Sequence, residues 1–543
     1  MKRKNTALTV AAVALTICIA SVLAIWYIMG HVFVDGRPYS RDAEFLDLRG
    51  RKISAEHYEK LRRKLPGCEV LWDIPFQDAY LPQDTTEITI TSLTDGQVRQ
   101  LDYLLQLKTV HADHCTDYSA LAALKTRRPE VEVVYSVTLN GTEYAQDIRE
   151  LEISGLPMEE VDRLNYLPDL ETVKLRSGGN NGSLGAIMEL CQERGIAFEV
   201  KLGGKTYDAQ TTSVTLKNAT DGELSLVRGL PALKKLHIED PQAKAENLVA
   251  LQVAYPQIDI SWEMDVCGVR VSSEDTVVDL YGARIPSIEE LENAMLYFPK
   301  AEKLALYGCV DPKLEGTIPQ DVEGVRPGGV MDMKKATVMD YEALAAYRDR
   351  VRDQYKVAWT VPCGKKLTVN TDDTSFMPTR EHVYYFLDSE SYNLRYCEDM
   401  ICMDLGHMAI THVEFANFMP NLEYLILAHT EVRTIEPLAN CKKLKFLELD
   451  WSTVKDFTPL LECTALEDLN IGNTYADVEP IMQMTWLNNL WMVGRSGAAY
   501  KVVQAMPDTN VVYAGDATVA SGWRNLSNYF AMRDVLKMDY MTW

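Results

Sequence analysis

Four stretches near the C-terminal end of the chain share one pattern: 422-LEYLILAHT, 444-LKFLELDWS, 466-LEDLNIGNT and 487-LNNLWMVGR. Each opens with Leu-x-x-Leu-x-Leu or a close variant, and the four starts are 22, 22 and 21 residues apart. Successive side chains of a strand point to opposite faces, so the regularly spaced leucines indicate one buried face. The fixed period indicates that copies of one structural unit stack on one another.

The copies also share the way they continue. Pro437, Pro459 and Pro480 follow the strand-like stretches and begin the segments that lead to the next copy. A short strand followed by a helix or an irregular turn every 22 residues is the leucine-rich-repeat pattern. The sequence therefore predicts an α/β leucine-rich-repeat solenoid, with regular repeats over residues 401–494.

The N-terminal half has the same period with insertions. The starts of its strand-like triplets are 22, 41, 22, 41, 22 and 42 residues apart, and the triplets centre on Thr89, His111, Glu152, Lys174, Thr215, His237 and Asp279. In the inserted stretches the character of the side chains alternates from residue to residue. Most of these stretches contain a glycine at which the chain is expected to turn, most clearly at Asn140-Gly141 and Gly203-Gly204. We predict β-hairpins on alternate repeats across residues 42–306. Each hairpin has an aromatic residue at one place, which we expect to serve packing: Trp72, Tyr135, Phe198, Trp262 and Trp359.

Two segments depart from the repeats. Residues 307–400 are expected to form an irregular enlarged module, which includes a Gly- and Pro-rich excursion at 308–335. Such an insertion is either a binding surface or a tolerated long loop, and the sequence favours neither. Residues 495–543 are expected to form a C-terminal cap, in which Trp523, Tyr529 and Met532 cover the last repeat.

The N-terminus indicates where the protein is located. Lys2, Arg3 and Lys4 precede an uncharged run over residues 7–30, which at the helical rise of ~1.5 Å per residue is long enough to cross a membrane. The run ends in bulky residues rather than in a cleavage site with small residues, which favours an uncleaved transmembrane signal anchor. We expect residues 1–6 in the cytoplasm, a linker at 31–41, and the bulk of the chain outside the cell in a single-pass arrangement.

The charge balance narrows the class of partner. The sequence has 55 basic and 78 acidic side chains, so its net charge is 55 − 78 = −23. Nucleic acid is excluded as the main partner, because binding phosphates requires a basic surface. We expect salt-sensitive attraction for basic partners instead.

Residues 380–543 resemble leucine-rich-repeat surface proteins of Gram-positive (Firmicutes-type) anaerobic bacteria, and the 22-residue repeats are similar to those of internalins. The segments that carry the resemblance are 394-LRYCEDMICMDLGHM, 419-MPNLEYLILAHTEV, 459-PLLECTALEDLNIGNTY and 522-GWRNLSNYFAMRDVLKMDYM. The resemblance implies a membrane-anchored extracellular binding protein, and it supplies no catalytic residues.

Motifs for catalysis or cofactor binding are missing from the sequence, so we predict a non-enzymatic protein without a cofactor or metal site. His111, His114 and Cys115 could ligate a metal, but the two histidines should point to opposite faces of a strand. Of the eleven cysteines, most are expected to be buried thiols, and Cys397 with Cys402 is the best candidate for a disulfide.

The predicted binding surface is the concave face of the sheet, where carboxylates and aromatic side chains recur at equivalent positions. Its candidate residues are Tyr424, Phe446, Glu448, Asp450, Asp468, Asn470 and Trp491. We predict recognition of an extracellular protein or peptide. The alternatives are a glycan or cell-wall ligand and, third, an enzyme with its site in residues 307–400.

Overall fold

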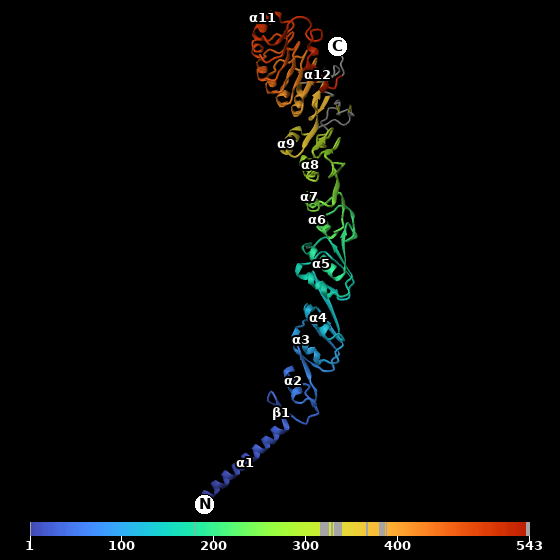
Figure 1. Cartoon of the computed structure of the whole chain (residues 1–543), viewed down its shortest axis with the longest axis vertical. Coiled ribbons are helices and arrows are strands. Elements are labelled where there is room, and N and C mark those ends of the chain that lie inside the picture. The colour runs from blue at the N-terminus through green and yellow to red at the C-terminus, as the bar shows by residue number, and fades with distance from the viewer. Residues whose placement is uncertain are drawn as a thin grey trace. The chain divides into compact units, whose positions relative to one another are not determined.

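The computed structural model describes residues 2–538 apart from 180, 315–324, 327–328, 331–338, 365–366, 379–385 and 387. Strands and helices alternate along the chain as repeats (Figure 1). The chain divides into two compact units, Met1–Thr212 with Gly222–Leu233, and Ser213–Asp221 with Lys234–Trp543. Of the predicted excursion 308–335, the structure describes 308–314 and two short paired strands, β21 (Val325–Arg326) and β22 (Gly329–Val330). The rest of the excursion lies outside the described residues.

The first unit begins with helix α1 (Lys2–Gly30), of which Thr9–Gly30 is long and apolar enough to cross a membrane. Residues 31–41, which the sequence suggested as a linker, form an antiparallel hairpin of β1 (His31–Val34) and β2 (Arg37–Ser40). The turn is Asp35-Gly36, and both residues have a positive φ. An Asp-Gly pair in this conformation favours a two-residue hairpin, which explains the difference.

Repeated modules make up the rest of the first unit. The first module pairs two short strands in parallel and adds a hairpin, and the next two form four-stranded sheets in the orders β10-β9-β8-β7 and β11-β12-β13-β14. The strands are β3 (Phe45–Asp47), β4 (Glu69–Leu71), β5 (Asp73–Phe76), β6 (Ala79–Pro82), β7 (Glu87–Ile90), β8 (Thr109–Ala112), β9 (Glu132–Leu139), β10 (Thr142–Ala145), β11 (Glu150–Ile153), β12 (Thr172–Arg176), β13 (Ala197–Leu202) and β14 (Lys205–Asp208). The helices between them are α2 (Ala55–Lys64), α3 (Asp95–Gln100), α4 (Tyr118–Arg127) and α5 (Leu184–Arg194).

The second unit begins with two more modules of this kind, whose sheets have the orders β15-β16-β17-β18 and β19-β20-β23-β24. Their strands are β15 (Ser213–Lys217), β16 (Lys235–Glu239), β17 (Asp259–Val266), β18 (Val269–Ser272), β19 (Val277–Asp279), β20 (Lys303–Leu306), β23 (Lys356–Gly364) and β24 (Leu367–Asn370). The helices that follow β15 in the chain are α6 (Asp221–Leu224), α7 (Ala245–Ala254), α8 (Ile288–Met295) and α9 (Tyr341–Val351).

The predicted hairpins are present, but in the four-stranded sheets they occur on every third strand rather than on alternate repeats. In β9, the first half pairs in parallel with β8 and the second half pairs antiparallel with β10. The long strand thus belongs to the repeat and to the hairpin at once, which the spacing of the triplets alone does not reveal. The turns Asn140-Gly141 and Gly203-Gly204 have positive φ at both residues, as predicted.

The aromatic residues of the hairpins pack in the interior. Trp72, Trp262 and Trp359 are fully buried, and Tyr135 and Phe198 are partly buried. Trp262 also donates a hydrogen bond from Nε1 to the carbonyl oxygen of Tyr297 at 2.7 Å. The predicted packing role is confirmed for the three tryptophans.

The C-terminal part of the second unit is a seven-stranded sheet in which all neighbours run parallel. Its strands are β25 (Ser375–Phe376), β26 (Cys402–Asp404), β27 (Tyr424–Ile426), β28 (Phe446–Glu448), β29 (Asp468–Asn470), β30 (Asn489–Trp491) and β31 (Asn510–Val512). Short 3-10 helices return the chain on the convex side: η9 (Glu414–Phe418), η10 (Glu436–Asn440), η11 (Thr458–Glu462) and η12 (Ile481–Gln483). Two longer helices are α11 (Ser496–Ala505) and α12 (Ser527–Val535), and α10 (Asp388–Ser391) is short.

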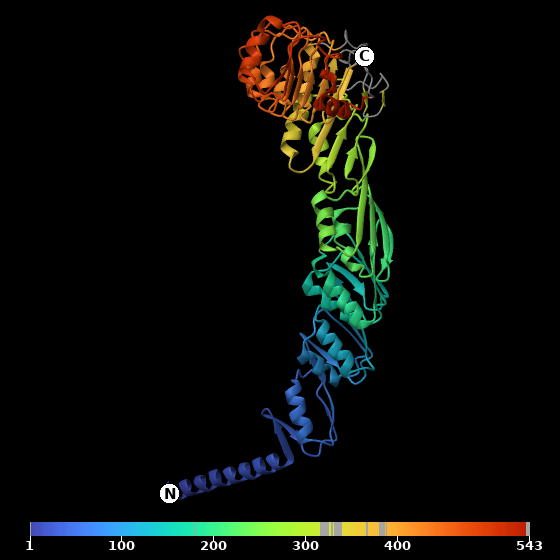
Figure 2. The same cartoon turned by 45° about the horizontal axis from the view of Figure 1, so that its top comes forward.

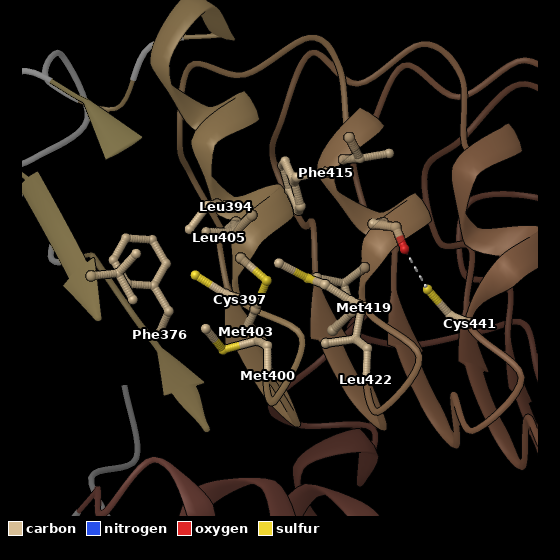
Figure 3. Close-up of a cluster of buried hydrophobic side chains, with 14 of the residues drawn as sticks. Phe376, Leu394, Cys397, Met400, Met403, Leu405, Phe415, Met419, Leu422 and Cys441 are labelled. Atoms are coloured by element: carbon tan, nitrogen blue, oxygen red, sulfur yellow. Dashed lines mark hydrogen bonds between the residues drawn. The ribbon is translucent and has the colours of Figure 1, made fainter. Parts of the chain in front are cut away.

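Leucines, methionines and cysteines fill the space between this sheet and the convex segments (Figure 3). Cys441 donates a hydrogen bond from Sγ to the carbonyl oxygen of Ala416 at 3.4 Å. All eleven cysteines are free thiols, so the suggested disulfide between Cys397 and Cys402 is wrong. Cys397 belongs to this core, whereas Cys402 belongs to a separate cluster on the concave face, so the sheet separates the two thiols.

Candidate binding site

The strand register brings the predicted binding residues together on the concave face of the seven-stranded sheet. One row runs through Tyr424, Phe446 and Asp468, which are paired across β27, β28 and β29. The next row contains Glu448, Asn470 and Trp491. Asp450 lies two residues beyond the end of β28. The side chains that were predicted to share one surface therefore lie in adjacent rows on one face of the sheet.

The C-terminal segment covers this face. Trp523 lies in η13 (Trp523–Asn525), and its ring is stacked 4.7 Å from the ring of Phe446 and lies 5.3 Å from that of Trp491. Trp523, Tyr529 and Met532 form one buried cluster with the concave rows, and Figure 2 shows α12 in dark red beside the orange strands. These three residues were expected to cover the last repeat; they pack on the concave face instead, and the repeats continue into α11 and β31.

Polar contacts hold the C-terminal segment to the same rows. Trp523 donates from Nε1 to Glu448 Oε2 at 2.7 Å, and Asn528 donates from Nδ2 to Asp468 Oδ2 at 3.0 Å. Asn470 donates to the carbonyl oxygen of Ala517 at 2.9 Å. The chain itself thus occupies hydrogen-bonding groups that the sequence assigned to a partner.

The predicted strip is consequently not exposed. Tyr424 retains 7% of its accessible surface, and the other six candidate residues retain 3% or less. The expectation of exposed aromatic side chains on this face was wrong, since it assumed an open concave surface. Whether any of these residues contacts a ligand stays a prediction.

A cavity of about 620 Å³ remains beside the covered strip, at the carboxyl ends of the strands β26, β27 and β28. Its polar lining includes Asp404, Glu448 and Arg524, and its rim includes His407 and His429. Apolar side chains complete the wall: Met377, Pro378, Ile426, Ala428, Val519 and Met538. A concave space with apolar walls and a few polar groups is what a specific ligand site requires.

The charges in and behind this cavity are mainly negative. Burial raises the pKa of Glu448, the charge of Arg524 and the hydrogen bond from Trp523 lower it, and the nearby carboxylates of Asp404 and Asp450 raise it; the net value is about 7. Burial also raises the pKa values of Asp404 and Asp450. Arg524 is the cation among the lining residues, and its Nη2 lies 3.6 Å from Glu448 Oε1.

Stacked rings follow the edge of the cavity. His407, His429 and Trp451 occupy the same position in successive repeats, 22 residues apart. The rings of the two histidines are 4.5 Å apart and nearly parallel, and Trp451 lies 6.1 Å beyond His429. All three residues are exposed and have positive φ values of 65°, 56° and 55°. The positive φ belongs to the turn of the repeat, since Asn473 and Gly494 share it at the next two equivalent positions.

The sequence matches no family model and no curated protein. Among solved structures, internalin C2 of Listeria monocytogenes is 16% identical, with 49% of this chain and 89% of its own covered, at a TM-score of 0.22. An internalin F of the same bacterium is 10% identical, with coverages of 85% and 96% and a TM-score of 0.21. A leucine-rich-repeat protein of Leptospira interrogans is 11% identical, with coverages of 78% and 93% and a TM-score of 0.22. At such TM-scores the likeness adds no support, and the leucine-rich-repeat fold is established by the 22-residue strand register.

Sequence reasoning missed Arg524, His407 and His429. A usable signal existed for the histidines, because they share one repeat position with Trp451. A signal for the covered face existed as well: residues 424–428 read YLILA, an uninterrupted apolar run that indicates a strand buried on both faces. No local signal marks Arg524, which reaches the site from the C-terminal segment.

In the first unit, carboxylates at the equivalent strand positions, Asp47 and Glu152, pair with neighbouring bases. Lys201 pairs with Glu152 at 3.1 Å, and Arg49 pairs with Asp47 at 2.7 Å. The two histidines considered as metal ligands contact different strands, since His111 bonds to Glu87 at 2.8 Å and His114 bonds to Glu143 at 2.5 Å. These contacts favour a solvated face over a recognition strip.

Two other clusters lie in the second unit. The ligand atoms of His237, Glu239 and Glu263 are within 4.8 Å of one another. Glu263, however, already accepts a hydrogen bond from Arg270 at 2.9 Å.

The second cluster surrounds a hollow within the 307–400 region, where the basic and acidic side chains pair with each other. Examples are Arg348 with Glu398 at 2.5 Å and Lys303 with Asp372 at 2.6 Å. Paired charges of this kind are typical of structural ion-pair networks.

Proposed function

We propose that the protein is a non-enzymatic, membrane-tethered leucine-rich-repeat protein that binds an extracellular protein or peptide. Helix α1 serves as the anchor, with residues 1–6 in the cytoplasm and the chain from residue 31 onward outside. The binding site is the cavity at the carboxyl ends of β26–β28, together with the ring ladder of His407, His429 and Trp451. The concave strip contributes indirectly, as the support on which the C-terminal segment rests.

The observation that carries this proposal is the cavity bordered by the exposed ladder. Three exposed rings contribute little to the core, and two of them line the cavity. Exposed aromatic side chains beside a desolvated pocket are typical of the anchors of protein interfaces. Loop ends of a rigid repeat scaffold are also where binding residues are commonly placed.

The binding test uses the full chain in lipid nanodiscs as bait for a displayed library of random peptides. We expect enriched peptides that are retained by the wild type and by Phe418→Ala, but poorly by Trp451→Ala. Phe418 is a suitable control because it is an exposed aromatic residue in η9, on the opposite side of the repeats. Failure to enrich any peptide above empty nanodiscs would contradict the proposal.

The topology test uses introduced cysteines and a maleimide that does not cross membranes. Tyr500→Cys, at a position that is 73% exposed in α11, should be labelled in intact cells. Asn5→Cys should be labelled only after the cells are permeabilised. The opposite pattern would overturn the proposed orientation.

A glycan ligand is the second candidate. It is favoured by a separate hollow of about 570 Å³ between Trp451 and Tyr475, whose other lining groups include Asn473, Lys455 and Asp477. Tyr475 is 90% exposed. Retention on a glycan array that is lost in Tyr475→Ala, with no peptide enriched, would select this candidate.

A further inference from the structure

We propose that the cavity at the carboxyl ends of β26–β28 binds a guanidinium group, namely that of an arginine side chain of the partner. This inference rests on the proposed function, because it names the group recognised at the same site. It is supported by the charge balance of the cavity, by an unsatisfied carboxylate oxygen, and by the shape of the wall.

Negative charge exceeds positive charge at this site. Asp404 and Glu448 line the cavity, and Arg524 is the cation among the lining residues. Two lining carboxylates against one guanidinium leave one carboxylate uncompensated, and ionised carboxylates are costly to bury without a cation. A second cation in the cavity would offset this cost.

Glu448 has an oxygen that points to the type of group required. The residue is fully buried, its Oε2 accepts from Trp523, and its Oε1 has no hydrogen-bond partner among the described residues. The 3.6 Å separation from Arg524 Nη2 exceeds hydrogen-bond length. A buried acceptor without a donor costs about 1–3 kcal/mol, so a ligand N–H group would be favoured here.

Arg524 does not supply that donor, because other contacts hold its guanidinium. Its Nη1 donates to the hydroxyl of Tyr529 at 2.6 Å, and the guanidinium lies over the Tyr529 ring at 5.0 Å. Its Nε also has no hydrogen-bond partner in the part of the chain that the structure describes. A ligand carboxylate could use that Nε, so the experiment includes a zwitterionic probe.

The wall suits a planar cation on an alkyl stem. Ile426, Val519 and Met377 provide apolar surface, and the parallel rings of His407 and His429 lie at the rim. Arginine stacks on planar rings and forms paired hydrogen bonds with carboxylates, whereas a lysine ammonium is a compact point charge. The combination therefore favours a guanidinium over an ammonium.

Titration calorimetry on the full chain in nanodiscs tests this inference with N-butylguanidinium and its uncharged isostere N-butylurea. We expect at least tenfold tighter binding of the guanidinium probe, and loss of that preference in Glu448→Gln. The glutamine retains an oxygen for Trp523. Glu414→Gln, a matched change at an exposed position in η9, should leave the preference unchanged. Equal affinity for the two probes, or a preference that survives in Glu448→Gln, would overturn the inference.

Two additions keep the test decisive. If Glu448→Gln loosens the C-terminal segment, Asp404→Asn is used instead. Asp404→Asn should also reduce the affinity for N-butylguanidinium. N-acetyl-arginine-amide should bind more tightly than free arginine, whose carboxylate would enter an acidic cavity. A preference for free arginine would overturn the assignment to a peptide side chain and indicate a zwitterionic ligand.

The two proposals fail in distinguishable ways. Enriched peptides that lack arginine would leave the proposed function standing and refute the guanidinium site. Binding of N-butylguanidinium without any enriched peptide would leave the cation site standing and refute the proposed function.

Discussion

Removal of the Trp523 side chain should release the C-terminal segment from the concave face without unfolding the repeats. Trp523 is fully buried, packs against the rings of Phe446 and Trp491, and donates a hydrogen bond to Glu448. It is the largest group that α12 and its flanking residues place on the sheet. The core between the sheet and the convex segments does not include it.

The size of the effect follows from the cost of truncating a buried tryptophan. Trp→Ala changes in cores typically cost about 3–5 kcal/mol. Since 1.4 kcal/mol is a factor of about ten, the equilibrium for opening the segment should shift by about two to three and a half orders of magnitude. The variant also loses the Trp523 N–H that donates to Glu448, which adds to this cost unless a water molecule replaces that donor.

Hydrogen exchange measured by mass spectrometry on the full chain reads this equilibrium directly, because local opening exposes backbone amides. In Trp523→Ala, amides of α12 should exchange about a hundredfold faster or more, while those of α11 keep their protection. Trp451→Ala is the matched control, since Trp451 is 53% exposed and lies outside the contact. Unchanged protection of α12 in Trp523→Ala would refute the reasoning, as would an equal loss in α11, which would indicate global unfolding.

Three further predictions concern burial elsewhere in the structure. The pKa of Glu448 rises from 4.5 to about 7 on folding, so the folded state binds the proton more tightly than the unfolded state. Protonation of Glu448 therefore stabilises the fold fully below about pH 4.5, and this stabilisation is lost as the pH rises through 7. In urea denaturation, the free energy of unfolding of the wild type should fall by about 3 kcal/mol relative to that of Glu448→Gln between pH 4.5 and pH 8. A difference between the two proteins that does not depend on pH would contradict this. Iodoacetamide at pH 8 should modify Cys267, which is partly exposed, before Cys397 and Cys402, whose burial raises their pKa, and mass spectrometry before and after urea would detect the order. Trp262→Ala should lower stability by about 3–5 kcal/mol in urea denaturation, whereas Tyr475→Ala, at an exposed site, should change it by less than about 0.5 kcal/mol.

The repeat architecture could be predicted because its determinants are local. The leucine positions fix which side of each strand is buried, and they also fix the register that places Glu448 beside Asn470. The hairpin turns could be predicted for the same reason, because an Asn-Gly pair such as Asn140-Gly141 favours the positive φ values of a two-residue turn. The third parallel strand of each module was missed because one long strand serves two partners.

Which segment covers the concave face could not be predicted from local pattern, because it depends on contacts between distant residues. Trp523 and Glu448 are 75 residues apart in the chain. Composition suggested an acidic, aromatic strip, and the carboxylates and rings are indeed adjacent. Their burial is decided by where the C-terminal segment folds, which follows from the apolar run 424–428 and not from any motif in the segment itself.

Glu448 links the C-terminal segment to the proposed cation site, because its two oxygens face different partners. Oε2 accepts the hydrogen bond that fixes Trp523, whereas Oε1 has no donor among the described residues, and the residue lines the cavity. On the proposed assignment, a guanidinium at Oε1 favours the ionised carboxylate, which is the stronger acceptor for Trp523. Ligand binding and docking of the segment then stabilise each other. A change that loosens the segment weakens ligand binding, and a bound ligand holds the segment more firmly. The segment would therefore act as one wall of the binding site, held in place by the same carboxylate that recognises the ligand.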